Sequence, residues 1–279
     1  MSVLQGLRHS AQSGSPAIRK VGEWMALHPL KAISLSADEI AVQAHASQSA
    51  VNRFATHAGF SSMAELRAAL MAELQDVQEP IAKLQRSGDL SSEHPFADAQ
   101  SGLLQAAHGL DIQALERCAS TLLKARHVYT LGLGMSHFAA GFAASALLPY
   151  VQGATHVSEG GGAEQIARRM MHLGQGDVLM AIAVPRYSMD TVTLAGAARS
   201  RGAFVVAVTD KMASPLAPVA DLVMLAPAEH RVMSHSYVSI VALIEAVTAS
   251  VMRLNSKAAS ITTDMYDAVL PHLLQMRRR

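Results

Sequence analysis

Four short apolar runs constrain the fold of this chain more than any other feature. They are HVYTLGLG (127–134), DVLMAIAV (177–184), AFVVAVTD (203–210) and DLVMLAP (221–227), and a weaker run, ATHV (154–157), lies between the first two. The runs start roughly 20–28 residues apart and are separated by helical patterns, which is typical of βαβ units. From about residue 126 onward we therefore predict an α/β unit, an open, mostly parallel five-stranded sheet with helices on both faces.

The N-terminal region shows only helical periodicity, and its most informative segment is LSADEIAVQAHASQSAVNRFATHAGF (35–60). Ser36 and Glu39 have the spacing of a capping box that starts one helix. Ser47 is a good N-cap for a second helix, which Gly59 ends. Two short helices with a tight turn predict an all-α helix-turn-helix domain. An ordinary helical hairpin with a solvated polar face fits the same pattern.

The polar face of the second helix is the candidate DNA-binding surface. Its side chains are short hydrogen-bonding groups and one arginine, which can reach phosphates or base edges in a major groove. They are Ser47, Gln48, Ser49, Asn52, Arg53, Thr56 and His57. The chain has 23 Lys and Arg against 22 Asp and Glu, so its net charge does not direct it to nucleic acid. DNA contact must therefore be local. Residues 1–70 carry six Lys and Arg against four Asp and Glu, a weak basic balance, so DNA affinity needs two copies of the chain on one duplex.

A segment rich in Pro, Ser, Gly and charged residues, at 78–100, separates the two regions. We predict a DNA-binding domain at 1–77, a linker at 78–105 and a second domain at 106–279.

The sequence also indicates a compartment. The N-terminus lacks the apolar core of a signal peptide, and the longest apolar stretch (237–252) carries Glu245, so it indicates a buried or interface helix. The single cysteine, Cys118, excludes an intramolecular disulfide and suits a reducing compartment. We expect a cytoplasmic protein without a membrane partner.

Two turns at the carboxyl ends of predicted strands are candidate ligand-binding sites. In the first, Gly134 precedes a helix that starts near Ser136, and free backbone N–H groups at a helix start bind anions. In the second, Arg186 offers a planar fork for phosphate or carboxylate, while Ser188 and Thr191 place hydroxyls at the next helix start. Carboxyl ends of parallel strands share one sheet edge, so the turns can converge on one anion.

Other interpretations of these residues remain open. In the first, Ser136 is a helix cap without a ligand-binding role. In the second, Arg186 is an exposed side chain before a capped helix. His137 stands where a dinucleotide fingerprint needs its third glycine, so we expect no NAD. The 13 histidines show no HxxxH pair, and Cys118 lies in a helical run typical of a core position. We therefore predict no metal and no cofactor.

Together these motifs resemble the RpiR family of bacterial transcriptional regulators, which join a helix-turn-helix to a sugar-isomerase (SIS) domain. SQSAVNRFATHAGF is similar to the family pattern S-x-A-T-V-x-R-F-x-x-x-L-G-F at Ser47, Val51, Arg53, Phe54, Gly59 and Phe60. GLGMS is similar to the SIS turn G-x-G-x-S, and VTDKMASPLAPVADLV to T-D-x-x-x-S-P-L-A-x-x-A-D. The resemblance covers nearly the whole chain and implies a regulator of transcription whose SIS domain senses a carbohydrate derivative.

The resemblance also implies a ligand loop, and here the chain departs from the family. The common loop reads S-x-S-G-x-T and holds a sugar phosphate; Ser188 and Thr191 keep its spacing, but Met189 replaces the glycine. Met189 and Tyr187 narrow the site, so a smaller phosphorylated or carboxylated metabolite is an alternative to a sugar phosphate. We expect the ligand to contact Gly134, Ser136, Arg186, Tyr187, Ser188 and Thr191.

A SIS-fold sugar-phosphate isomerase is the alternative function, and it needs a general base. Candidates for the base are Glu159, Glu164, Glu229, His230 and His235. SIS isomerases do not usually carry a helix-turn-helix, so we expect a sensor and not an enzyme. The helices at 136–150 and 237–252 have more apolar surface than one sheet face needs, which predicts a homodimer or homotetramer on double-stranded operator DNA.

Overall fold

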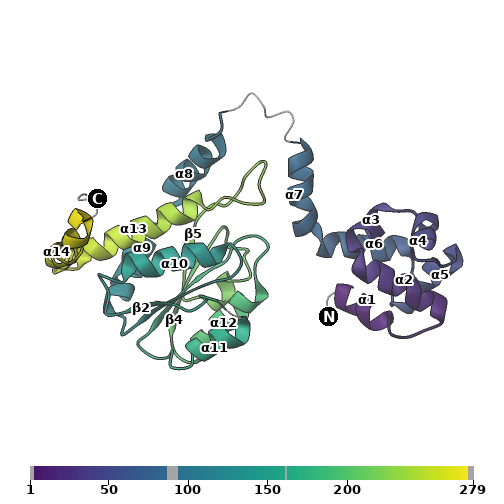
Figure 1. The fold of residues 1–279 in the computed structure, drawn as a ribbon, viewed down its shortest axis with the longest axis horizontal. Coiled ribbons are helices and arrows are strands. Elements are labelled where there is room, and N and C mark those ends of the chain that lie inside the picture. Colours follow the sequence, from purple (N-terminus) through teal and green to yellow (C-terminus); the bar gives the residue numbers. More distant parts are fainter. Residues whose placement is uncertain (1–2, 87–93, 161, 276–279) are drawn as a thin grey trace. The chain divides into compact units, whose positions relative to one another are not determined.

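The computed structural model describes residues 3–86, 94–160 and 162–275 (Figure 1). The chain divides into two compact units, Met1–Arg86 and Ser87–Arg279, which we describe separately. Helices α7 (Gln75–Arg86) and α8 (Ala97–Gly109) lie largely within the segment predicted as a linker. The domain boundaries at 1–77, 78–105 and 106–279 stay a prediction.

The first unit is entirely helical within its described residues. Its helices are α1 (Val3–Ser10), α2 (Pro16–Leu27), α3 (Pro29–Ser34), α4 (Ala37–Gln43), α5 (Gln48–His57), α6 (Met63–Glu73) and α7. Phe54 is the largest fully buried side chain in its core. A Cβ atom at Gly22 of α2 would lie 2.6 Å from the Phe54 ring and 2.9 Å from Ala11, so this close approach requires glycine.

Local signals in the sequence set the ends of α4 and α5. The predicted capping box is present, since Glu39 N–H donates to Ser36 Oγ (3.2 Å) and Ser36 N–H donates to Glu39 Oε2 (2.7 Å). Ser47 caps α5 by accepting from the N–H of Ala50. The turn between the helices needs a left-handed residue, His45 (φ +48°), and Gly59 (φ +90°) follows the end of α5. The helix-turn-helix geometry is therefore encoded locally.

The second unit contains a five-stranded sheet in the order β2-β1-β3-β4-β5. The strands are β1 (Val128–Gly132), β2 (Ala154–His156), β3 (Val178–Ile182), β4 (Phe204–Thr209) and β5 (Leu222–Leu225). Every neighbouring pair is parallel. This confirms the predicted sheet, including the weak strand at 154–157, and all five residues of the central strand β3 are buried.

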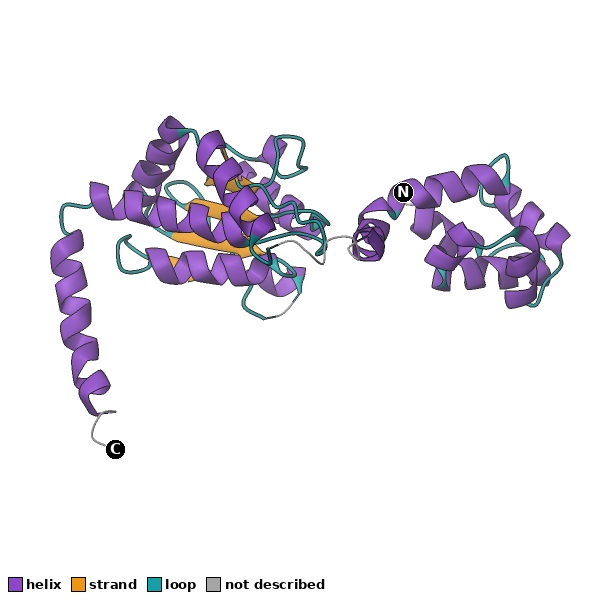
Figure 2. Cartoon of the chain, turned by 90° about the horizontal axis from the view of Figure 1, so that it is seen from above, coloured by secondary structure: helices purple, strands orange, loops and turns teal. Residues whose placement is uncertain are grey.

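Helices cover both faces of the sheet, as predicted (Figures 1 and 2). One face packs against α9 (Ile112–Lys124), α10 (Ser136–Leu147) and α13 (Val238–Leu254). The other face packs against α11 (Ala163–Arg169), α12 (Met189–Ser200) and the short 3₁₀ turn η2 (Ala217–Val219). Helix α8 contacts α13. The chain bends by 110° between α13 and the last helix, α14 (Ala258–Gln275).

Among the described residues, no single helix is both long and apolar enough to cross a membrane. Helix α13 together with 258–270 would meet the length and composition criteria only as a bent pair.

Candidate functional site

The candidate DNA-binding residues lie together on the exposed face of α5 and its N-cap. Ser47, Gln48, Ser49, Asn52, Arg53, Thr56 and His57 are all exposed. The opposite face of the helix buries Ala50, Val51, Phe54 and Ala55. A helix with one face in the core and one continuous polar face is the arrangement that a major groove accepts.

One contact of this face was not expected from the sequence. His57 Nε2 lies 2.9 Å from Ser13 Oγ, in the turn between α1 and α2. The C-terminal end of α5 is therefore tied to a turn more than 40 residues earlier in the chain. By contrast, among the described residues Arg53 makes only a long contact within its own helix, from Nε to the Ser49 carbonyl oxygen (3.4 Å).

The second candidate site lies where the connections of the sheet reverse direction. After β1 the chain passes through α10 to β2 on one side, and after β3 it passes through α12 to β4 on the other side. Strands β1 and β3 are neighbours, and Gly132 pairs with Ile182 at their carboxyl ends. Such a switch point leaves a crevice between the two strand ends, which is where ligands of open α/β sheets bind.

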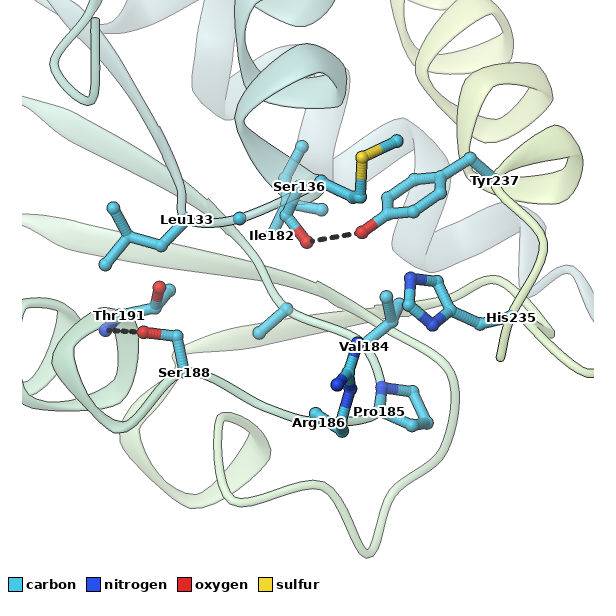
Figure 3. Close-up of a pocket in the computed structure, with 13 residues that line it drawn as sticks. Leu133, Ser136, Ile182, Val184, Pro185, Arg186, Ser188, Thr191, His235 and Tyr237 are labelled. Carbon is cyan, nitrogen blue, oxygen red and sulfur yellow. Dashed lines mark hydrogen bonds between the residues drawn. The ribbon is translucent and has the colours of Figure 1, made fainter. Parts of the chain in front are cut away.

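A pocket of about 220 Å³ occupies this crevice (Figure 3). The β1–α10 turn, the β3–α12 loop and the segment before α13 form its wall. The lining residues are Leu133, Gly134, Met135, Ser136, Ile182, Ala183, Val184, Pro185, Arg186, Ser188, Thr191, His235 and Tyr237. The structure thus brings together five of the six predicted ligand residues, all except Tyr187.

Two polar groups of the pocket are left without a partner among the described residues. Thr191 is 0% exposed, and its Oγ1 makes no hydrogen bond. A buried hydroxyl in this state costs roughly 1–3 kcal/mol. Arg186 has no ion pair within the described part of the chain, and its guanidinium points toward the side of the pocket formed by Ser136 and Tyr237 (Figure 3). Both groups can therefore hold an anion.

The start of α10 differs from its prediction. The N–H groups of Ser136 and His137 are not free, because they donate to the carbonyl oxygens of Leu133 and Gly134 at 3.2 Å. The tight turn around Gly134 (φ +59°) brings these carbonyls within reach. In this helix, the hydroxyl of Ser136 is the polar group that faces the pocket, and it lies 3.1 Å from the Tyr237 hydroxyl.

Tyr237 is a site residue that the sequence did not identify. It precedes α13, 101 residues after its partner Ser136, and no local motif marks it. Burial raises the pKa of the Tyr237 phenol above its ordinary value, although the hydrogen bond with Ser136 opposes this shift. The phenol therefore stays protonated and can donate to an anion.

The β3–α12 loop directs some of its side chains to the pocket and one, Tyr187, to the core. Ser188 caps α12 by accepting from the N–H of Thr191 (3.4 Å). Tyr187 is half-buried against the core beneath α12, and its hydroxyl donates to the Asp210 carboxylate at 2.6 Å. Arg186, which precedes both residues, has a left-handed conformation (φ +25°).

The residues considered as an isomerase base do not gather at the pocket. Of the five, only His235 lines it. His230 pairs with Asp98 at 3.4 Å, and Glu164 pairs with Arg168 on α11. Within the described chain, no group of three or more His, Cys, Asp or Glu side chains could hold a metal ion. Burial raises the pKa of the Cys118 thiol to about 12, which fits its position in the core.

The fold and the site define a class of protein, in which a helix-turn-helix unit is joined to a sugar-isomerase-type α/β unit. The chain belongs to the RpiR family of transcriptional regulators. A family model described as "Helix-turn-helix domain, rpiR family" matches residues 1–77, and the SIS domain model matches residues 121–256.

Two related proteins are named as HTH-type transcriptional regulators. The chain is 24% identical to the uncharacterized HTH-type transcriptional regulator YbbH of Bacillus subtilis, covering 80% of this chain and 77% of that protein. It is 26% identical to the regulator HexR of Escherichia coli, with coverages of 80% and 76%.

Solved structures share the fold. The sugar isomerase domain of an RpiR transcription factor from Sphaerobacter thermophilus superposes with a TM-score of 0.57 and 27% identity, covering 61% of this chain and 94% of that chain. The Vibrio vulnificus NanR protein, complexed with ManNAc-6P, superposes with a TM-score of 0.55 and 18% identity, covering 97% and 98%.

Proposed function

We propose that this protein binds operator DNA through the exposed face of α5 and that a small anionic metabolite in the switch-point pocket changes this binding. The metabolite is a sugar phosphate or a related phosphorylated or carboxylated compound. Gly134, Ser136, Arg186, Ser188 and Thr191 form the ligand site, and Tyr237 adds a donor. Membership of a family of helix-turn-helix regulators supports the DNA-binding half of the proposal.

The single observation that carries the ligand half is the pair of unsatisfied groups in the pocket. The buried Thr191 hydroxyl lacks a partner among the described residues, and the Arg186 side chain adds a fixed positive charge. An oxyanion satisfies both at once, because it accepts hydrogen bonds from a hydroxyl and a guanidinium. The complex of the NanR protein with ManNAc-6P is consistent with a phosphorylated ligand.

We propose a sensor and not an enzyme. Isomerisation needs a base next to the substrate carbon. The described lining of the pocket offers His235 for that role and no carboxylate.

The experiment measures fluorescence anisotropy of labelled DNA from the upstream region of the protein's own operon, titrated with the full-length chain. Phosphorylated sugars and organic acids are first screened by thermal shift, and each stabilising compound is then added to the DNA titration. We expect binding that exceeds that of unrelated DNA and changes with the compound. Equal affinity for both DNAs would contradict the regulator, and turnover of the compound would contradict the sensor.

We further propose that the chain acts as a homodimer or homotetramer, because DNA affinity from one small reading surface is weak. Helix α10 leaves Phe138 67% exposed and Phe142 38% exposed, which is apolar surface that a second copy can cover. Sedimentation velocity at micromolar concentration tests this, and a monomer would contradict it.

A further inference from the structure

The loop that carries Arg186 is held by a hydrogen bond that lies outside the pocket. The Tyr187 hydroxyl donates to Asp210 Oδ1 at 2.6 Å, just beyond the end of β4. The same oxygen lies 3.4 Å from Thr209 Oγ1, and Lys211 Nζ lies 4.0 Å from the other oxygen, Oδ2. The Thr209 hydroxyl donates its proton to the Ala183 carbonyl oxygen (2.8 Å), so the Tyr187 hydroxyl is the donor that holds Oδ1 of this carboxylate.

Arg186 needs such a support. Its φ of +25° lies in the left-handed region, which a residue with a Cβ adopts only where the surroundings hold it. Ser188 fixes the following end of the loop as the cap of α12, and β3 fixes the preceding end. Tyr187 is the direct neighbour of Arg186, so its attachment to β4 limits the rotation of the backbone that aims the guanidinium.

We propose that Tyr187 and Asp210 form a latch that positions Arg186 for anion binding, and that Tyr187 does not contact the ligand. This inference rests on the proposed function, because it assigns Tyr187 a role toward the same pocket. It replaces the expectation that Tyr187 belongs to the ligand-contacting residues. With the latch open, Arg186 samples many conformations, and the anion must order the side chain as it binds.

The test is isothermal titration calorimetry of the full-length protein with inorganic phosphate at constant ionic strength. Tyr187→Phe keeps the ring and removes the hydroxyl. We expect it to weaken phosphate binding roughly three- to tenfold, which lies in the lower part of the coupling energies between residues of one network. Asp210→Ala should weaken binding to the same degree. Asp210→Asn should restore most of the affinity, because the amide oxygen still accepts from Tyr187.

A double-variant comparison separates positioning from general stability. In the Arg186→Ala background the latch has nothing to position, so adding Tyr187→Phe should not weaken binding further. Tyr150→Phe is the matched control, since it removes a phenol hydrogen bond to Thr262 (3.2 Å) on the other side of the unit. It should lower the melting temperature without changing phosphate affinity.

The outcomes are distinguishable. Wild-type affinity in Tyr187→Phe, or losses that add up in the double variant, would overturn the latch while leaving the anion pocket intact. Unchanged phosphate affinity in Arg186→Ala, or a wild-type protein that binds no phosphate, would overturn the pocket itself and the latch with it.

Discussion

Helix α5, the proposed DNA-reading helix, and the β3–α12 loop both present polar side chains, but the two regions hold them in opposite ways. On α5 the N-cap hydrogen bond is formed, the side chains that face the core are buried, and the polar face is exposed to water. In the loop, Arg186 is held in a left-handed conformation, and in the first turn of α12 the Thr191 hydroxyl is buried without a partner among the described residues. A surface for DNA can thus be optimised for stability, whereas a ligand pocket retains unsatisfied groups that only the ligand satisfies.

The strongest test of this comparison lies on the buried face of α5. Phe54→Ala should destabilise the first unit by about 3–5 kcal/mol, because it leaves a cavity beside Gly22. Thermal unfolding followed by circular dichroism measures the loss. Operator binding should disappear with folding, while phosphate binding by the second unit should persist. Loss of phosphate binding as well would mean that the units do not fold independently.

The pocket offers the next largest effect. Arg186→Ala removes a charge-assisted contact and should weaken effector binding tenfold to a hundredfold, on the order of 1.5–3 kcal/mol. Calorimetric titration measures it. Operator binding without effector should stay close to wild type, because the proposed reading surface belongs to the other unit. A fall in effector-free DNA affinity would contradict that separation.

On the exposed face of α5, Arg53→Ala should weaken operator binding by about 1–3 kcal/mol if the side chain reads a base. If it contacts phosphate instead, affinity should fall similarly on all sequences and the salt slope should fall by about one. Anisotropy titrations at several salt concentrations distinguish the two. Unfolding stability should not change, and an unaltered operator affinity would place the reading surface elsewhere.

Thr191→Val tests the hydroxyl that has no partner among the described residues. Unlike the preceding variants, it should make the ligand-free protein more stable. The variant should raise the stability of the ligand-free protein by about 1 kcal/mol and weaken phosphate binding, because it removes an unsatisfied buried group. Thr130→Val is the matched control: Thr130 is equally buried, but its hydroxyl donates to the Ala140 carbonyl oxygen at 2.8 Å. This control variant should lower the stability of the protein, because it removes a satisfied hydrogen bond. Destabilisation by Thr191→Val would show that its hydroxyl is satisfied in the free protein.

The smallest effect is expected at the turn before α5. His45→Gly relieves a left-handed backbone and should stabilise the first unit by about 0.5–1 kcal/mol, after the greater flexibility of glycine in the unfolded chain is subtracted. Thermal unfolding measures the gain. A loss of stability would mean that the His45 side chain makes a contribution larger than the strain.

How well the sequence predicted each feature depends on how far apart the interacting residues lie along the chain. The caps at Ser36 and Ser47 and the stop at Gly59 depend on neighbours within a few positions, and they were predicted correctly. The strands followed from apolar runs, and their parallel order followed from the helices between them.

The contacts that the sequence did not predict join segments that are distant along the chain. Ser136 meets Tyr237, His57 meets Ser13, and no periodicity encodes such pairs. The prediction of free N–H groups at the start of α10 was wrong. The turn at Gly134 is tight, so these N–H groups donate to carbonyl oxygens of the turn. The sequence therefore indicated where the pocket lies more reliably than which of its groups are available.

The complete burial of Thr191 also has a consequence for timing. Thr191 lines the proposed anion pocket but is 0% exposed, so we expect an anion to reach its hydroxyl with an opening of the neighbouring β3–α12 loop and to associate more slowly than the diffusion limit. Dissociation requires the same opening. If the proposed effector leaves this slowly, the transcriptional response lags behind removal of the metabolite, and brief fluctuations of the metabolite are filtered out.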